Sequence, residues 1–198
     1  MPVDLPELLL KDAVEWRAWL AEHHADRPGV WLALHKKGGS ATELDYATAL
    51  EHALCFGWID GQVKRRDAES FFQRWTPRTK KSIWSVKNTE HIADLEARGL
   101  MQPAGRLAVQ AAKDDGRWAQ AYQRQSDAEL PPDLLAAVAL VPEAQQMLDV
   151  LNTQNRFALY FRLSQLKTDL GRKRRIEAFV QMLARHEAPY PQKQKPEA

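Results

Sequence analysis

Cysteine is almost absent from this chain of 198 residues, which contains only Cys55. A single cysteine cannot form an internal disulfide bond, whereas proteins of oxidising compartments often rely on such bonds. The first ten residues also lack the basic region of a signal peptide, and Pro6 interrupts their short apolar run. We therefore expect a cytoplasmic protein.

Long hydrophobic runs and the motifs of common enzyme classes are missing too. No stretch approaches the roughly 18 apolar residues that a membrane-spanning helix requires, so no transmembrane segment is expected. The chain has no glycine-rich nucleotide loop, no G-x-S-x-G motif and no C-x-x-C pair. Adjacent His23 and His24 would point about 100° apart on a helix, which disfavours a shared metal ion. We expect neither a metal nor a cofactor, and the sequence indicates no enzyme.

Tryptophan, by contrast, is plentiful: the chain has seven, and none lies beyond Trp118. Because large aromatic side chains dominate protein cores, residues 1–129 are predicted to form one aromatic-rich domain. A polar segment then closes with a proline pair, and helical patterns follow it. We predict a helical module over residues 130–187 and, from the polar composition of "YPQKQKPEA", a disordered tail over 188–198.

The first domain carries clear helix signals. Apolar residues at helical spacing predict one helix that begins after Asp12 and a second that begins after Asp45 and ends at Gly57. A third helix is predicted over residues 85–100, capped by either Ser85 or Asn88.

Strand signals lie between these helices. Alternating residues predict a strand at 30–36 and two longer strands joined around 67–70, although the Asp60-Gly61 dipeptide offers an alternative turn. The predicted fold class is therefore α+β: a small antiparallel sheet with packed helices, followed by a C-terminal all-helical module.

Basic residues are concentrated in two blocks, although the formal net charge is only +2. Residues 74–88, "RWTPRTKKSIWSVKN", mix cations with tryptophans and lead into a predicted helix N-terminus. Such a segment could bind a nucleic acid or a phosphorylated ligand, or it could be a solvated loop whose tryptophans pack inward. The second block, 172–175, is a weaker signal because consecutive residues wind around a helix.

Two residues are candidates for chemistry. Cys55 lies one turn after His52, which resembles a nucleophile and its base, but apolar neighbours raise the pKa of a thiol and favour a buried structural role. Asp60 could act as an acid or base, although a carboxylate at a strand start often bonds only local backbone.

Several strings occur in an order that resembles a known family: "WRAWL", "VWLALHKK", "YxxALxxALCFGWIDG", "TPRxxxSxWSxxN", "GLMxPAG" and "RKRRIEAFVQMLA". Together they are similar to the YdeI/OmpD-associated family, often called bacteriocin-protection proteins, from Trp16 to about Ala184. The resemblance implies a link to bacterial stress, to tolerance of antimicrobial peptides and to an outer-membrane porin. It implies no established catalytic mechanism.

The resemblance also carries over motif positions without assigning them chemical roles: Cys55, Gly57, Trp58, Ile59, Asp60, Gly61, Pro77, Arg78, Ser82, Trp84, Ser85 and Asn88. We expect a ligand-binding groove where the Asp60-Gly61 segment meets the loop of residues 78–88. Its predicted residues are Asp60, Gly61, Arg78, Ser82, Trp84, Ser85 and Asn88.

The leading hypothesis is a non-enzymatic cytoplasmic binding protein that acts in stress tolerance. Its partner would be a small anionic ligand or another protein. One alternative is a nucleic-acid-binding protein that uses residues 74–88 and 172–175. Another is an enzyme with Asp60 as its acid or base.

Overall fold

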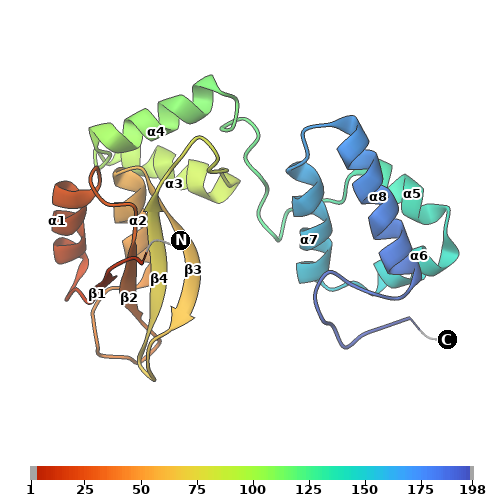
Figure 1. The fold of residues 1–198 in the computed structure, drawn as a ribbon, viewed down its shortest axis with the longest axis horizontal. Coiled ribbons are helices and arrows are strands. Elements are labelled where there is room, and N and C mark those ends of the chain that lie inside the picture. The colour runs from red at the N-terminus through yellow and green to blue at the C-terminus, as the bar shows by residue number, and fades with distance from the viewer. Residues whose placement is uncertain (1–3, 197–198) are drawn as a thin grey trace. The chain divides into compact units, whose positions relative to one another are not determined.

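The computed structural model describes residues 4–196 and divides them into two units, the first ending at Ala121 and the second beginning at Tyr122 (Figure 1). The first unit contains β1 (Glu7–Leu8), α1 (Ala13–His23), β2 (Val30–His35), α2 (Tyr46–Cys55), β3 (Trp58–Arg65), β4 (Ser70–Pro77), α3 (Val86–Ala97) and α4 (Pro103–Asp114). The second contains α5 (Pro132–Ala139), α6 (Pro142–Asp149), α7 (Thr153–Ser164) and α8 (Asp169–Ala184). The α+β class with a helical C-terminal module is thus confirmed.

The four strands form one sheet in the order β1-β2-β4-β3. Strand β4 pairs antiparallel with both β2 and β3, and the hairpin of β3 and β4 has its turn near residues 67–70, as predicted. The pairing of β3 with β4 shifts register between Asp60 and Val63, so the Asp60-Gly61 dipeptide lies inside an irregular strand and the hairpin turn comes later. The short parallel pairing of β1 with β2 was not predicted, because two residues carry no readable alternation.

Side-chain caps begin α1, α2 and α3 where the sequence places them. The carboxylates of Asp12 and Asp45 accept hydrogen bonds from the first turns of α1 and α2. At α3, where two caps were possible, Ser85 Oγ accepts from the backbone N–H of Asn88 at 3.1 Å. Asn88 therefore lies in the first turn of the helix.

Tryptophan builds the core of the first unit, and α2 lies behind the sheet in Figure 1. Trp16 of α1 contacts Trp58 and Trp75 of the sheet, with ring centroids 6.5 and 6.1 Å away. Its indole N–H donates to the carbonyl of Ala49 at 3.1 Å, which joins α1 to α2. Because the buried indole N–H has this partner, its burial carries no desolvation penalty from an unmade hydrogen bond.

The second unit packs α5 to α8 around a separate apolar core. The segment after α8 lies against this core as well, although its composition predicts disorder. Asn155 of α7 is fully buried. Its amide exchanges hydrogen bonds with the backbone of Tyr190 and donates to the side chain of Gln192. These long-range bonds order the segment, and composition alone cannot reveal them.

Candidate ligand-binding site

Arg78 begins the loop that was predicted to bind a ligand, and its side chain braces that loop. The guanidinium lies over the ring of Trp84, 3.5 Å from its centre, and donates to the carbonyl of Ile83 at 3.0 Å. Trp84 is only 1% exposed. The predicted inward packing of this tryptophan is confirmed, and the cation–π contact stabilises it.

The two predicted serines of the loop satisfy local backbone donors. Ser82 Oγ accepts from the N–H of Thr79 at 2.9 Å, and Ser85 Oγ caps α3. Arg117, which the sequence did not suggest, donates to the carbonyls of Thr79 and Ser82 from 35 to 38 residues away. Only the folded structure brings Arg117 to this loop, because no local pattern links the two segments.

Asp60 and Gly61 lie on β3. The carboxylate of Asp60 accepts a hydrogen bond from the hydroxyl of Tyr46 on α2 at 3.0 Å. The three atoms nearest to a Cβ added at Gly61 belong to the Arg74 side chain and lie at ordinary contact distances of 3.7 to 3.8 Å, so this position does not require glycine. The observed contacts give most of the seven predicted residues a role in the fold, and their action as one ligand site stays a prediction.

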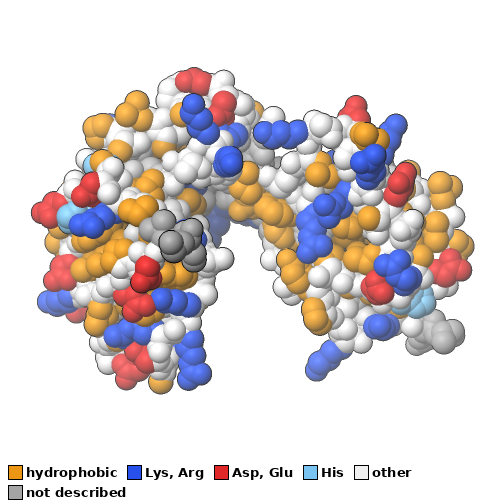
Figure 2. All heavy atoms as spheres, viewed as in Figure 1, with side chains coloured by type: hydrophobic (Ala, Val, Ile, Leu, Met, Phe, Trp, Pro, Cys, Tyr) orange, Lys and Arg blue, Asp and Glu red, His pale blue; other side chains and the backbone are white. Residues whose placement is uncertain are grey.

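The second basic block, 172–175, is partly committed to the helical module. Arg172 forms a bidentate pair with Asp133, with distances of 2.6 and 2.8 Å, and the Arg175 guanidinium lies 5.9 Å from the centre of the Phe179 ring. Over the first unit, the face in Figure 2 shows basic side chains interspersed with acidic ones. Nucleic-acid binding stays a prediction that these contacts do not favour.

The Cys55 thiol is buried, as predicted. Burial raises its pKa above the ordinary value, and this effect outweighs the opposite effect of the nearby Arg17. A thiol with a raised pKa is a poor nucleophile at neutral pH, so a Cys55–His52 catalytic pair is not supported.

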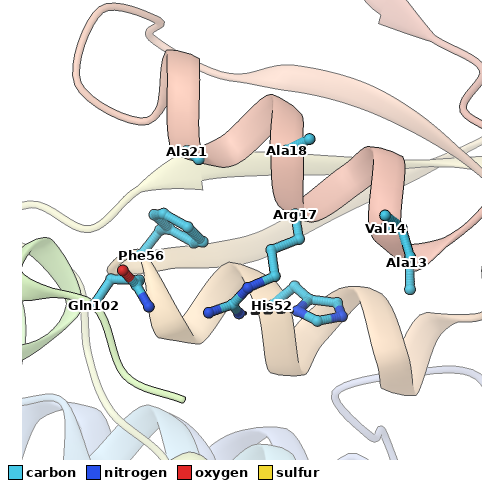
Figure 3. Close-up of a pocket in the computed structure, with 8 residues that line it drawn as sticks. All are labelled: Ala13, Val14, Arg17, Ala18, Ala21, His52, Phe56 and Gln102. Atoms are coloured by element: carbon cyan, nitrogen blue, oxygen red, sulfur yellow. Dashed lines mark hydrogen bonds between the residues drawn. The ribbon is translucent and has the colours of Figure 1, made fainter. Parts of the chain in front are cut away.

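An open groove lies between α1 and α2, with a volume of about 420 Å³ (Figure 3). Most of its surface is apolar, and only three lining residues carry a polar side chain. The lining residues are Ala13, Val14, Arg17, Ala18, Ala21, His52, Phe56 and Gln102. Sequence reasoning missed this groove because its residues look like the exposed faces of separate helices.

Arg17 extends from α1 across the groove toward α2 (Figure 3). Its Nη1 donates to Nδ1 of His52 at 3.3 Å, and its Nη2 donates to the carbonyl of Leu100 at 3.2 Å. The guanidinium also lies 5.6 Å from the centre of the Phe56 ring. Contacts on three sides fix the position of this cation.

The surroundings of His52 favour its neutral form at neutral pH. Its partial burial, and then the positive charge of Arg17, lower the pKa of the imidazole below its ordinary value. A neutral ring can accept the hydrogen bond from Arg17 at Nδ1, whereas a protonated ring cannot. The pair therefore carries one positive charge, on Arg17.

That charge has no carboxylate partner within residues 4–196, where Arg17 forms no salt bridge. The acidic neighbour of His52, Glu51, instead pairs with Arg98 at 3.3 Å. The groove thus combines apolar walls with an oriented, uncompensated guanidinium. Chemically, such a site can hold an apolar molecule and attract a negative group.

Among the described residues, no three histidine, cysteine, aspartate or glutamate side chains are placed to hold a metal ion. None of the helices in the same range has the length and hydrophobicity to cross a membrane.

Fold and groove together define a two-unit protein: an α+β domain with a small open groove, followed by a helical module. Residues 8–108, about half of the chain, match the family described as a domain of unknown function, DUF8412, and the chain belongs to that family. Residues 127–186 match the family described as bacteriocin-protection, YdeI or OmpD-associated.

The second match confirms the family that the sequence motifs indicated. It covers the helical module, whereas the resemblance was expected to extend from Trp16 to about Ala184. The motifs around Cys55 and Arg78 lie in the part that matches the other family. Comparison with curated proteins and with solved structures gave no match.

Proposed function

We propose that the protein is a non-enzymatic binding protein of the bacteriocin-protection type, which takes a small ligand in the groove between α1 and α2. The observation that carries this proposal is the groove itself, with its volume of about 420 Å³ and its mostly apolar lining. Ligand sites of proteins are typically concave and apolar, with a few placed polar groups.

The polar groups of the groove suit binding better than catalysis. An arginine side chain does not release its proton under physiological conditions, and the neutral His52 is already engaged as the acceptor of Arg17. The nearby thiol of Cys55 is buried, with a raised pKa. These three groups can orient a ligand, but they supply neither an activated nucleophile nor a free general base.

The cellular role that we propose is tolerance of antimicrobial peptides or related stress, exerted in the cytoplasm. The match of residues 127–186 to the bacteriocin-protection family supports the first part. The single cysteine, a free and buried thiol, supports the second because it needs no oxidising compartment.

A groove-filling substitution tests the proposal. Ala18 lies in the lining of the groove and is exposed, so Ala18→Trp should block the groove while leaving the helix intact. In cells that lack the native gene and are challenged with an antimicrobial peptide, this variant should lose the protection that the wild type restores. Ala93→Trp, at an exposed position of α3, is the matched control and should protect fully. Full protection by Ala18→Trp at equal protein level would overturn the proposal.

A further inference from the structure

We infer that the ligand of the groove is an amphipathic monoanion, a single carboxylate on an alkyl or aryl body, and that Arg17 binds the carboxylate. This inference rests on the proposed function, since it names the chemistry of the ligand in that groove. It combines the charge, the geometry and the walls of the site.

The positive charge of Arg17 favours a ligand with a negative group. Within residues 4–196 this side chain has no carboxylate partner, and its hydrogen bonds to His52 and Leu100 go to a neutral imidazole and a backbone carbonyl. These acceptors orient the guanidinium without neutralising it. Arg17 is half-buried beside apolar walls, so an incoming anion interacts with it more strongly than it would with a fully exposed side chain.

The geometry of Arg17 suits a carboxylate in particular. A guanidinium has five N–H donors, and the bonds to His52 and Leu100 use two of them. These two bonds hold the plane of the guanidinium, so a ligand that enters the groove meets a side chain that is already oriented. Planar N–H pairs match the two oxygens of a carboxylate, and an oriented side chain loses little rotamer freedom on binding.

The apolar walls of the groove favour a ligand whose remaining part is apolar. Val14 is 76% exposed, and Ala18 and Ala21 lie along the same side of α1. Phe56 forms the opposite wall near the guanidinium. An alkyl chain or aromatic ring laid on these side chains removes apolar surface from water, which is favourable.

The number of charges limits the ligand to one negative group. Arg17 is the single lysine or arginine among the lining residues. A second anionic group would find no further cation among the lining residues, and a cationic ligand would face repulsion from Arg17. A neutral ligand of the same shape would fill the groove but leave the guanidinium unpaired.

Three ten-carbon probes test the inference on the full chain: decanoate, decanol and decyltrimethylammonium. The two ionic probes are kept below their micelle concentrations and decanol below its solubility limit, and binding is followed by calorimetry. Decanoate should bind about tenfold more tightly than decanol, because a hydrogen bond between charged groups adds at least that factor. Decyltrimethylammonium should bind most weakly. The Ala18→Trp variant should bind none of the three.

Two variants test whether the preference for decanoate over decanol comes from Arg17. Arg17→Gln should reduce the affinity for decanoate to that for decanol. Arg27→Gln, which removes an exposed arginine that is not among the lining residues, should bind all three probes as the wild type does. If Arg17→Gln does not fold, as judged by circular dichroism, the wild-type comparison of decanoate with decanol decides alone.

Equal binding of decanoate and decanol by the wild type would overturn the inference and leave the groove as a site for neutral apolar ligands. The inference would also be overturned if none of the three probes bound to the wild type. Neither result would decide the proposed function, because the protection assay with Ala18→Trp tests that separately.

Discussion

The guanidinium carbon of Arg78 lies 3.5 Å from the centre of the Trp84 ring, at the start of the loop that leads into α3. Arg78, a residue of the family motif, therefore has a structural role: its side chain covers Trp84, which is almost fully buried. Arg78→Ala should therefore lower the free energy of unfolding by about 1–3 kcal/mol, measured by urea denaturation.

Lys80 provides the control for this prediction, because it is exposed in the same loop. Lys80→Ala should change the free energy of unfolding by less than about 0.5 kcal/mol. If Arg78→Ala were equally harmless and instead abolished protection in cells, the original prediction of a ligand-binding Arg78 would be favoured.

Gly57, after the end of α2, combines a positive φ with a close neighbour. Its φ is 74°, and a Cβ added there would lie 3.1 Å from the carbonyl oxygen of Ala104 and from Cβ of Ala108. Gly99 has a similar φ of 67° but nothing within 4 Å. Both alanine variants should lose stability from the left-handed backbone, about 1 kcal/mol each.

Gly57→Ala should lose at least about 1 kcal/mol more than Gly99→Ala, because α4 must shift to make room for the methyl group. Thermal or urea denaturation of the two variants measures this difference directly. Equal losses would mean that the contact between Gly57 and α4 relaxes without cost.

The lowered pKa of His52 should make the stability of the fold depend on pH. Burial and the charge of Arg17 lower the pKa of His52 in the folded chain. The unfolded chain therefore takes up a proton first as the pH falls below the ordinary histidine value of about 6.5, and stability decreases from there down to the folded pKa. The melting temperature of the wild type should fall between pH 7 and pH 5.

The variant His52→Gln isolates this contribution, because glutamine does not titrate. Its melting temperature should fall less than that of the wild type over the same interval. The carboxylates of Asp45 and Asp133 do not confound the test: hydrogen bonds to Thr48 and to Arg172 lower their pKa values, so their contribution is lost only at more acidic pH. Parallel pH profiles for the two proteins would contradict the prediction.

Asn155 makes the segment after α8 part of the fold. Its amide nitrogen donates to the carbonyl of Tyr190 at 3.1 Å and to the side chain of Gln192 at 2.8 Å. A chain that ends at Ala188 leaves this buried amide without these partners and should be less stable by about 1–3 kcal/mol. A chain that ends at Lys195 keeps all of them and should match the full chain in urea denaturation, whereas equal stability of both truncations would refute the role of Asn155.

Local chemistry accounts for the parts of the fold that were predictable. Asp12 and Asp45 cap helices, and Gly57 ends one, because each acts on backbone groups only a few residues away. The groove, the bonds of Arg117 and the order around Tyr190 all depend on contacts between distant segments. No spacing rule along one segment contains that information.

The irregular pairing at Asp60 has a consequence for how the molecule behaves in a crowded solution. Strand β3 ends the strand order, so one of its sides carries no neighbouring strand within the described residues. A regular edge would offer a continuous template for another chain, and such templates seed aggregation. The register shift after Asp60, followed by the cations Lys64 and Arg65, breaks that template. The irregularity at Asp60-Gly61, the dipeptide that resembles a hairpin turn, therefore disfavours strand pairing between molecules.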